Sequence, residues 1–280
     1  MKNNALILEG GGMRGIFTSG VLDAFLEEDI HLPYVIGVSM GAYTGASYIT
    51  NQKCRNKEVL LECILNDDFF DIKRIFTNEC ILHSDFVFVM MNKFKNPFDY
   101  CAFNRSTKRF LAVATNIETG QPCYFEKNKI NCFEKTLKAS CAYPGLTDFV
   151  KINGNDYIDG GVSDPIPYKK ALLDGNKKLL IVLTHPKGYI ERSPWYLNAS
   201  SVVYKKYPNL VEILKKRHEK YNKTLEELEK LEEKGVAYLI RPDIDVSILT
   251  RDFVKLSKSY DEGYEKTIKK SQEIKLFLNR

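Results

Sequence analysis

Two unbroken apolar runs near the start of the chain predict strands that are buried on both faces of a sheet. The first is Ala5–Leu8, and the second begins at Tyr34 and ends before Gly37. Strands of a parallel sheet have this character because helices cover both of their faces. Between the runs, apolar residues recur at helical spacing over Ile16–Glu28, which predicts a helix with one buried side. The strand–helix–strand order predicts an α/β sandwich with parallel strands.

The remainder of the chain continues this alternation. We expect helices over Met40–Ile49, Phe133–Cys141 and Lys206–Lys234, and one or two surface helices within Arg251–Leu278. The expected strands form two hairpins and two further strands: Phe110–Thr115 with Cys123–Phe125, Val150–Ile152 with Tyr157–Ile158, then Lys178–Thr184 and Val236–Arg241.

Residues 52–104 are rich in aromatic side chains and give a less regular pattern. One or two helices are expected there, including Ser84–Phe94. The segment is interpreted either as a helical cap with its own core or as a lid or acyl-chain groove over an active site. Aromatic residues usually signal packing, which favours the cap.

Composition is that of a globular protein. The chain has 280 residues, 44% of them hydrophobic, and a net charge of +5 with basic and acidic residues interspersed. Because no block of Lys and Arg stands out, nucleic-acid binding is not indicated. No stretch approaches the length of a transmembrane helix, and the first apolar run is too short for a secretory signal. We therefore expect a cytoplasmic protein.

Cysteine and histidine usage does not indicate a metal site. The seven cysteines include no C-x-x-C pair, and the four histidines are scattered and pair with no cysteine at ligand spacing. In a cytoplasmic protein the cysteines are expected to be reduced thiols that mostly fill the core.

The run Gly37-Val38-Ser39-Met40-Gly41 fits the nucleophile elbow G-x-S-x-G. In this motif a serine lies on a strained strand-to-helix turn, and the glycines are required where backbone segments approach too closely for a Cβ. The hydroxyl then projects at a helix N-terminus, which favours developing negative charge. The alternative is an ordinary turn with a serine N-cap, but the strand before it and the helix after it favour the elbow.

A second glycine motif, Gly10-Gly11-Gly12-Met13-Arg14-Gly15, follows the first strand. It also fits the dinucleotide fingerprint G-x-G-x-x-G, but the second strand does not end in the acidic residue that would hold a ribose. A P-loop is excluded because no Gly-Lys-Ser/Thr follows. Such a loop can instead present backbone N–H groups to an anion, as an oxyanion hole requires. A glycine-rich turn without a ligand is the alternative.

A serine nucleophile needs a base, and the sequence offers two candidates. Asp159, at the end of the second hairpin, is followed by Gly160 and Gly161, whose lack of side chains leaves the acid open to a cleft. An ordinary Asp-Gly turn is the other interpretation. His185 could complete a triad in the order Ser39, Asp159, His185, as in α/β-hydrolases. Against the triad, only one strand and one helix precede the elbow.

Taken together, these motifs resemble those of the bacterial patatin-like phospholipases. The resemblance extends from Leu6 to about Thr184 and is weaker beyond. Glu9 stands before the glycine triplet, where the family usually has Asp. The motifs that carry the resemblance are, in order, Gly10–Gly15, Gly37–Gly41, Ala139–Pro144, and Asp159–Gly161 with Pro165 and Pro167 after it.

The resemblance implies a three-layer α/β/α sandwich with a mainly parallel central sheet. It also implies a catalytic domain over residues 1–184, with 52–104 as a cap or lid-like insertion. Residues 185–280 would form a mostly helical C-terminal extension that contributes one strand near 236–241.

The resemblance further implies a Ser-Asp dyad, in which Ser39 attacks an acyl ester and Asp159 is the base. Backbone N–H groups of Gly10, Gly11, Gly12 and Met13 would hold the oxyanion, with Met40 as an added donor. Supporting motif positions are Arg14, Gly15, Gly37, Met40, Gly41, Gly160 and Gly161. A free aspartate has a pKa of about 4, so burial would have to raise the pKa of Asp159 for it to act as a base.

The expected function is therefore that of a serine lipid acyl hydrolase that cleaves phospholipids or related esters through an acyl-enzyme. No cofactor and no metal are expected. Expected partners are the lipid substrate and a peripheral membrane surface, with no nucleic acid. The alternatives are a Ser-His-Asp esterase or thioesterase that uses His185 on small soluble esters, and a non-catalytic lipid-binding module.

Overall fold

The computed structural model describes residues 3–65, 97–130, 132–193 and 201–279. The prediction of a helix over Ser84–Phe94 lies outside these residues, as does most of the predicted cap or lid. At the two ends of that segment, the structure has α3 (Arg55–Leu65) and α5 (Tyr100–Arg105).

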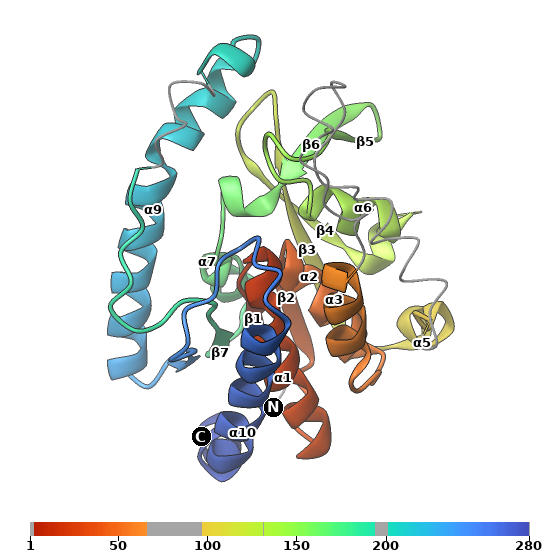
Figure 1. The fold of residues 1–280 in the computed structure, drawn as a ribbon, viewed down its shortest axis with the longest axis vertical. Helices are drawn as coiled ribbons and strands as arrows, with labels where there is room; N and C mark the ends of the chain where they lie inside the picture. The colour runs from red at the N-terminus through yellow and green to blue at the C-terminus, as the bar shows by residue number, and fades with distance from the viewer. Residues whose placement is uncertain (1–2, 66–96, 131, 194–200, 280) are drawn as a thin grey trace.

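An eight-stranded mixed sheet forms the centre of the protein (Figure 1). Five strands run parallel in the order β3-β2-β1-β7-β8, while β4 and β6 pair antiparallel with β3, and β5 pairs with β6. The predicted α/β class with a mainly parallel sheet is confirmed. The strands are β1 (Asn4–Leu8), β2 (Tyr34–Val38), β3 (Arg109–Asn116), β4 (Pro122–Glu126), β5 (Val150–Ile152), β6 (Asn155–Asp159), β7 (Lys178–Val182) and β8 (Ala237–Ile240).

Alternate residues of the parallel strands face opposite helical layers. On β1, Leu6 and Leu8 join a core formed with α1, α2, α3 and α10, whereas Ala5 and Ile7 join a core formed with α7 and α9. This alternation is the two-residue period of a strand. The helices are α1 (Gly15–Glu27), α2 (Met40–Ile49), α6 (Phe133–Ser140), α7 (Tyr168–Leu173), α9 (Pro208–Glu233) and α10 (Phe253–Asn279).

The last helix differs from its prediction as a surface element. α10 is one continuous helix that packs closely on α1. A Cβ on Gly20 would lie 2.1 Å from the Tyr260 carbonyl oxygen, and one on Gly263 would lie 2.3 Å from the Phe17 oxygen. The backbones approach this closely because both positions lack a side chain. As a result, α1 is buried almost all round rather than on one side.

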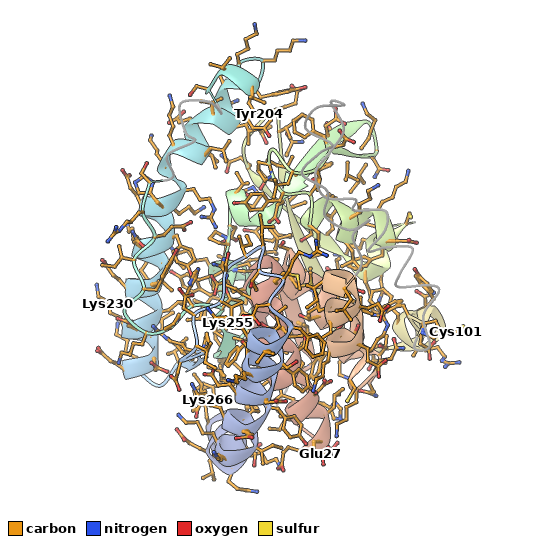
Figure 2. The ribbon with its side chains drawn as sticks, in the orientation of Figure 1. Glu27, Cys101, Tyr204, Lys230, Lys255 and Lys266 are labelled. Atoms are coloured by element: carbon orange, nitrogen blue, oxygen red, sulfur yellow. The ribbon has the colours of Figure 1, made fainter. Side chains whose placement is uncertain are left out.

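The C-terminal region continues the central sheet, because β8 pairs in parallel with β7. α9 lies along one side of the molecule, with Tyr204 and Lys230 toward its opposite ends (Figures 1 and 2). Its apolar side chains Leu225 and Leu228 join the core on that face of the sheet. The helix predicted over Lys206–Lys234 is therefore amphipathic.

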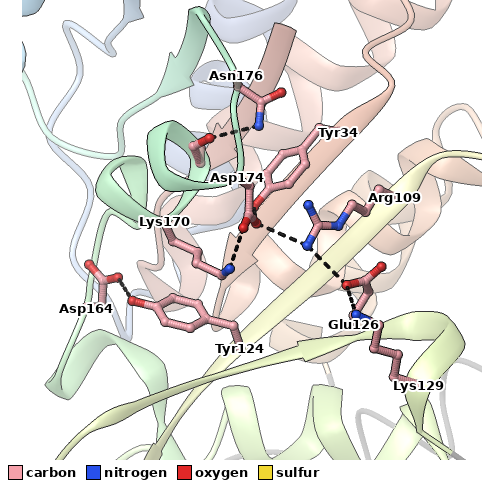
Figure 3. Close-up of polar contacts among 10 residues, drawn as sticks. Tyr34, Arg109, Tyr124, Glu126, Lys129, Asp164, Lys170, Asp174 and Asn176 are labelled. Carbon is pink, nitrogen blue, oxygen red and sulfur yellow. Dashed lines mark hydrogen bonds and ion pairs between the residues drawn. The ribbon is translucent and has the colours of Figure 1, made fainter. Parts of the chain in front are cut away.

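A cluster of ion pairs and hydrogen bonds joins the starts of β2 and β3 to α7 (Figure 3). Asp174 accepts a hydrogen bond from the Tyr34 hydroxyl at 2.8 Å and pairs with Lys170 at 2.6 Å and Arg109 at 3.2 Å. Arg109 also pairs with Glu126 at 3.2 Å. These residues lie at the amino ends of the parallel strands, whereas Ser39 follows the carboxyl end of β2. The cluster is structural.

Six of the seven cysteines lie within the described residues, and all six are free thiols. Cys63 is buried, as expected of a core residue, but Cys101 and Cys132 are exposed. For these two, the prediction that cysteines fill the core is wrong.

Candidate active site

Ser39 occupies a strained turn between β2 and α2. Its backbone has φ 52° and ψ −126°, which is unusual for a residue with a Cβ. A Cβ on Gly37 would lie 2.5 Å from the Gly41 carbonyl oxygen, and a Cβ on Gly41 would lie 2.5 Å from the Leu8 oxygen. Both motif glycines are therefore required by close backbone approach, as expected for a nucleophile elbow.

The elbow is held from the side by α6. The backbone N–H of Ser39 donates to the Ser140 hydroxyl at 2.8 Å, and that hydroxyl donates to the Val113 carbonyl at 2.6 Å. Ser140 lies within the segment Ala139–Pro144 that supported the family resemblance. Its contact with the elbow could not be predicted, because it joins residues 101 positions apart.

Asp159 ends β6 and is buried, with only 4% of its surface exposed. Its Oδ1 accepts a hydrogen bond from the Gly161 N–H at 2.7 Å, and its carboxyl group also takes part in a side-chain hydrogen bond with Ser39. A Cβ on Gly160 would meet the Val113 carbonyl oxygen at 2.3 Å, so the loop after Asp159 requires glycine there. The structure thus brings the two predicted catalytic residues together.

The environment of Asp159 alters its acidity. Burial raises the pKa of this carboxyl group to about 6, while the hydrogen bonds from Ser39 and Gly161 and the positive charge of Arg217 act in the opposite direction. A carboxylate with this pKa is a far better proton acceptor near neutral pH than a free aspartate.

The glycine loop passes directly beside the elbow. A Cβ on Gly10 would lie 3.0 Å from the Ser39 Cβ, and a Cβ on Gly15 would lie 2.3 Å from the Met40 side chain. Gly12 has φ +53° and approaches Ile248 of the C-terminal region. The loop therefore carries glycine where the chain passes close to other groups.

Two backbone N–H groups of the loop, one of them a predicted oxyanion donor, already have hydrogen-bond acceptors. The backbone N–H of Met13 donates to the Ile248 carbonyl at 3.0 Å, and that of Arg14 donates to the Gly11 carbonyl at 3.1 Å. Arg14 lies just before α1 and lines the same pocket as Ser39.

Glu9 anchors the start of this loop. One carboxylate oxygen accepts the Thr184 N–H at 2.6 Å, and the other accepts the Tyr221 hydroxyl of α9 at 2.6 Å. Burial raises the pKa of Glu9, whereas these hydrogen bonds lower it. The family resemblance placed Asp at this position, and the glutamate reaches from β1 to the C-terminal helix.

A pocket of about 550 Å³ contains Ser39 and Asp159, a size within the range of small-molecule sites. Two of the residues that line it are exposed to solvent: Val203 exposes 68% of its surface and Leu249 exposes 39%. Its other lining residues are mostly small or apolar: Gly10, Gly11, Gly12, Arg14, Tyr143, Pro144, Gly145, Leu146, Gly161, Val162, Pro165, Tyr204, Leu214, Arg217 and Ile248.

Several of these pocket residues were not found from the sequence. Arg217, Ile248 and Leu249 belong to segments with no local motif. Arg217 lies in the helix predicted over Lys206–Lys234, but nothing in the sequence there signals a site. Only the fold brings these residues beside the elbow.

His185 has a different set of partners. Its ring stacks on Tyr189 with centroids 3.5 Å apart, and its Nδ1 lies 3.6 Å from the Asp245 carboxylate. Burial, followed by the positive charges of Arg14 and Arg217, lowers the pKa of His185 to about 3. It is not among the described residues that line the Ser39 pocket.

Within the described ranges, no three or more His, Cys, Asp or Glu side chains come together in a way that could hold a metal ion. None of the described helices combines the length and apolar character needed to cross a lipid bilayer.

Residues 6–172 match the family described as patatin-like phospholipase. The chain belongs to this family. Residues 207–279, which include α9, β8 and α10, match a domain family of unknown function, DUF6363. The expected family is thus confirmed, and the C-terminal helices match a separate family model.

Related proteins agree with this membership. The chain is 32% identical to the uncharacterized protein YjjU of Escherichia coli over 69% of its own length and 55% of that protein. It is 24% identical to human patatin-like phospholipase domain-containing protein 6, over 93% of this chain and 20% of the human protein. The chain therefore spans about half or less of these relatives.

Among solved structures, VipD from Legionella pneumophila has a similar fold, with a TM-score of 0.52 and 13% identity. The alignment covers 96% of this chain and 66% of VipD.

Proposed function

We propose that this patatin-like phospholipase family member is a serine lipid acyl hydrolase that uses a Ser39–Asp159 dyad. The observation that carries the proposal is a strained serine hydrogen-bonded to a buried aspartate whose pKa is raised to about 6. Both residues open into one pocket of about 550 Å³. A nucleophile and a base within hydrogen-bond reach are the minimum for acyl transfer.

In the first half of the reaction, Ser39 Oγ forms a bond to the carbonyl carbon of the ester, and its proton passes to the Asp159 carboxylate. The tetrahedral intermediate then collapses, the carbon–oxygen bond to the alcohol breaks, and the alcohol leaves with the proton held by Asp159. An acyl-enzyme on Ser39 remains.

In the second half, a water molecule attacks the acyl carbon and gives its proton to Asp159. The bond between the acyl carbon and Ser39 Oγ breaks, and the proton returns to Ser39 as the carboxylic acid is released. Asp159 is therefore base and acid in turn, and the dyad returns to its starting protonation state.

The negative charge on the intermediate requires hydrogen-bond donors beside Ser39. We assign this role to backbone N–H groups of Gly10, Gly11 and Gly12, with Met40 as an added donor at the start of α2. Met13 was also predicted as a donor, but its N–H donates to Ile248, and this makes it the weakest of the predicted group.

A lipid substrate is supported by family membership and by the apolar lining of the pocket. Val203 and Leu249 are exposed at the pocket, and Val202, Phe253 and Val254 nearby in sequence are exposed by 71%, 45% and 61%. Exposed apolar side chains around a pocket suit peripheral contact with a lipid surface. We propose that the protein takes its substrate from such a surface.

The test is the release of fatty acid from mixed phospholipid vesicles by wild type and by Ser39→Ala. Release by the wild type that is lost in Ser39→Ala supports the proposal. A short soluble ester is tested beside the vesicles. Cleavage of that ester alone overturns the lipid assignment, and turnover that persists in Ser39→Ala overturns the nucleophile assignment.

A further inference from the structure

We infer that α9, in the C-terminal region, completes the active site, and that Arg217 positions the loop of the proposed base. The two family matches divide the chain into a patatin-like part and a C-terminal part of unknown function. Arg217 lies in the second part, yet it lines the pocket that contains Ser39 and Asp159.

Arg217 contacts the backbone directly after Asp159. Its Nε donates to the Gly161 carbonyl at 2.7 Å, and Gly161 in turn donates its N–H to Asp159 Oδ1 at 2.7 Å. The guanidinium group is held on its other side by an ion pair with Glu191. A planar guanidinium with two fixed partners restrains the carbonyl it contacts more strongly than a single flexible donor would.

The same face of α9 reaches both catalytic loops. Lys220 donates to the Ser163 carbonyl, just beyond the Asp159 loop. Tyr221, one helical turn after Arg217, donates to Glu9, which begins the glycine loop. One turn of helix therefore connects the loop of the base with the loop assigned to the oxyanion.

Arg217 also contributes its charge. The groups that interact with Asp159 are Ser39 and Gly161, the thiol of Cys141 and the Arg217 guanidinium, and Arg217 is the cation of this set. Its charge lowers the pKa of Asp159 and opposes the effect of burial. Removing that charge must raise the pKa of Asp159. On acidification, Asp159 would then become protonated and stop acting as a base at a higher pH than in wild type.

Because this role concerns the Asp159 loop, it rests on the proposed function. The two are separated by measuring the rate at which an alkyl fluorophosphonate labels Ser39. In that reaction Ser39 Oγ bonds to phosphorus, fluoride leaves and the serine proton passes to the base. Labelling of wild type that is absent in Ser39→Ala establishes the nucleophile independently of any Arg217 variant. Labelling that persists in Ser39→Ala overturns the proposed function.

Arg217→Met removes both the charge and the hydrogen bond to Gly161. We expect the labelling rate constant to fall on the order of 10- to 100-fold. We also expect the acid limb of its pH profile to move upward by about 0.5 to 1 pH unit. A purely structural residue would lower the active fraction without moving this limb.

Arg217→Lys keeps the charge but loses the forked guanidinium group, which contacts both the Gly161 carbonyl and Glu191. It should restore the acid limb to the wild-type position and recover part of the rate. Lys216→Met is the matched control, because Lys216 precedes Arg217 on α9 and its side chain is 66% exposed. This control should label as the wild type does.

The inference is overturned if Arg217→Met, folded by circular dichroism, labels at the wild-type rate with the wild-type acid limb. It is also overturned if the rate falls equally in Arg217→Met and Arg217→Lys while the acid limb stays fixed in both. If Arg217→Met does not fold, Arg217→Lys decides: a full wild-type rate then excludes a positioning role for the guanidinium fork.

Discussion

The Ser140 hydroxyl accepts a hydrogen bond from the Ser39 backbone N–H at 2.8 Å and donates one to the Val113 carbonyl at 2.6 Å. Ser140 is buried, so both partners depend on it rather than on water. Through this single hydroxyl, α6 fixes the strained turn that carries Ser39 against β3. The strain at Ser39 therefore has an identifiable support outside the elbow motif.

Replacing Ser140 by Ala should weaken this support. Two backbone groups, one buried and one partly buried, lose this partner, which should lower the free energy of unfolding by about 1–3 kcal/mol. The turn at Ser39 can then relax, so ester hydrolysis should fall by more than stability alone explains. Urea unfolding and kcat on a short soluble ester measure the two effects. Lys135→Ala, at an exposed position of the same helix, should change neither. Wild-type kcat in folded Ser140→Ala would contradict the role.

The elbow, the glycine loop and the Asp159 turn could be predicted because each is marked by a short motif of adjacent residues. A Cβ on Gly37 would meet the Gly41 carbonyl oxygen four residues later, and α2 has the predicted bounds Met40–Ile49. The strands were predicted for the same reason, since burial on two faces leaves an apolar run such as Ala5–Leu8.

The rest depends on contacts between distant parts of the chain. Arg217 lies in a predicted helix that carries no local motif of a site, and only the packing of α9 on the sheet brings it to Gly161. Likewise, nothing near Gly263 in the sequence marks it as the point where α10 meets α1. Tertiary packing decides such positions, and a local pattern cannot show it.

The raised pKa of Asp159 predicts the pH dependence of the reaction. The base must be ionised, so kcat/KM should be level above about pH 7 and fall tenfold per pH unit below its pKa of about 6. A profile on a short soluble ester between pH 4 and 8 measures this. A rate that stays level down to pH 4.5 would show that the base has an ordinary carboxyl pKa, or is another group.

The raised pKa of Asp159 also affects stability. Ionising this residue is needed for activity but lowers the free energy of unfolding. Since burial raises the pKa of Asp159 from 3.8 to about 6, ionising it in the folded state costs up to about 3 kcal/mol. This cost is absent below about pH 4, grows as the pH rises to about 6, and is complete above that.

Asp159→Asn, which cannot ionise, should therefore be inactive but more stable than wild type at pH 7.5, by up to about 3 kcal/mol. At pH 4 the two proteins should be nearly equal. Urea unfolding at both pH values tests this. Asp156→Asn, which removes a partly exposed ion pair with Lys151, should change stability by less than about 1 kcal/mol. Equal stability of Asp159→Asn and wild type at pH 7.5 would rule out the burial penalty.

The contact between α1 and α10 predicts a stability effect away from the site. Gly20→Ala would place a Cβ 2.1 Å from the Tyr260 carbonyl oxygen, so the helices must move apart, at a cost of about 1–3 kcal/mol. Gly263→Ala should cost a similar amount. Once the helices have separated, the second alanine should add little. The double variant should therefore lose less stability than the sum of the losses in the two single variants. Lys258→Ala, exposed on α10, is the control. Additive losses would mean that the two glycines act separately.

His185→Ala distinguishes the dyad from a Ser-His-Asp triad. In the structure His185 stacks on Tyr189, and its pKa is lowered to about 3, so the ring is neutral at the pH of any assay near 7. Loss of the ring should cost about 1–2 kcal/mol of stability through lost packing. The value of kcat/KM should nevertheless stay within about threefold of wild type, because the Asp159 carboxyl group interacts with Ser39 directly.

The measurement is kcat/KM on both vesicles and a soluble ester, at a temperature where the His185→Ala variant is fully folded. Tyr189→Leu is the matched control, since it disturbs the same stack without touching the imidazole. A loss of several orders of magnitude in His185→Ala, with Tyr189→Leu unaffected, would make histidine the base and leave Asp159 as its orienting partner.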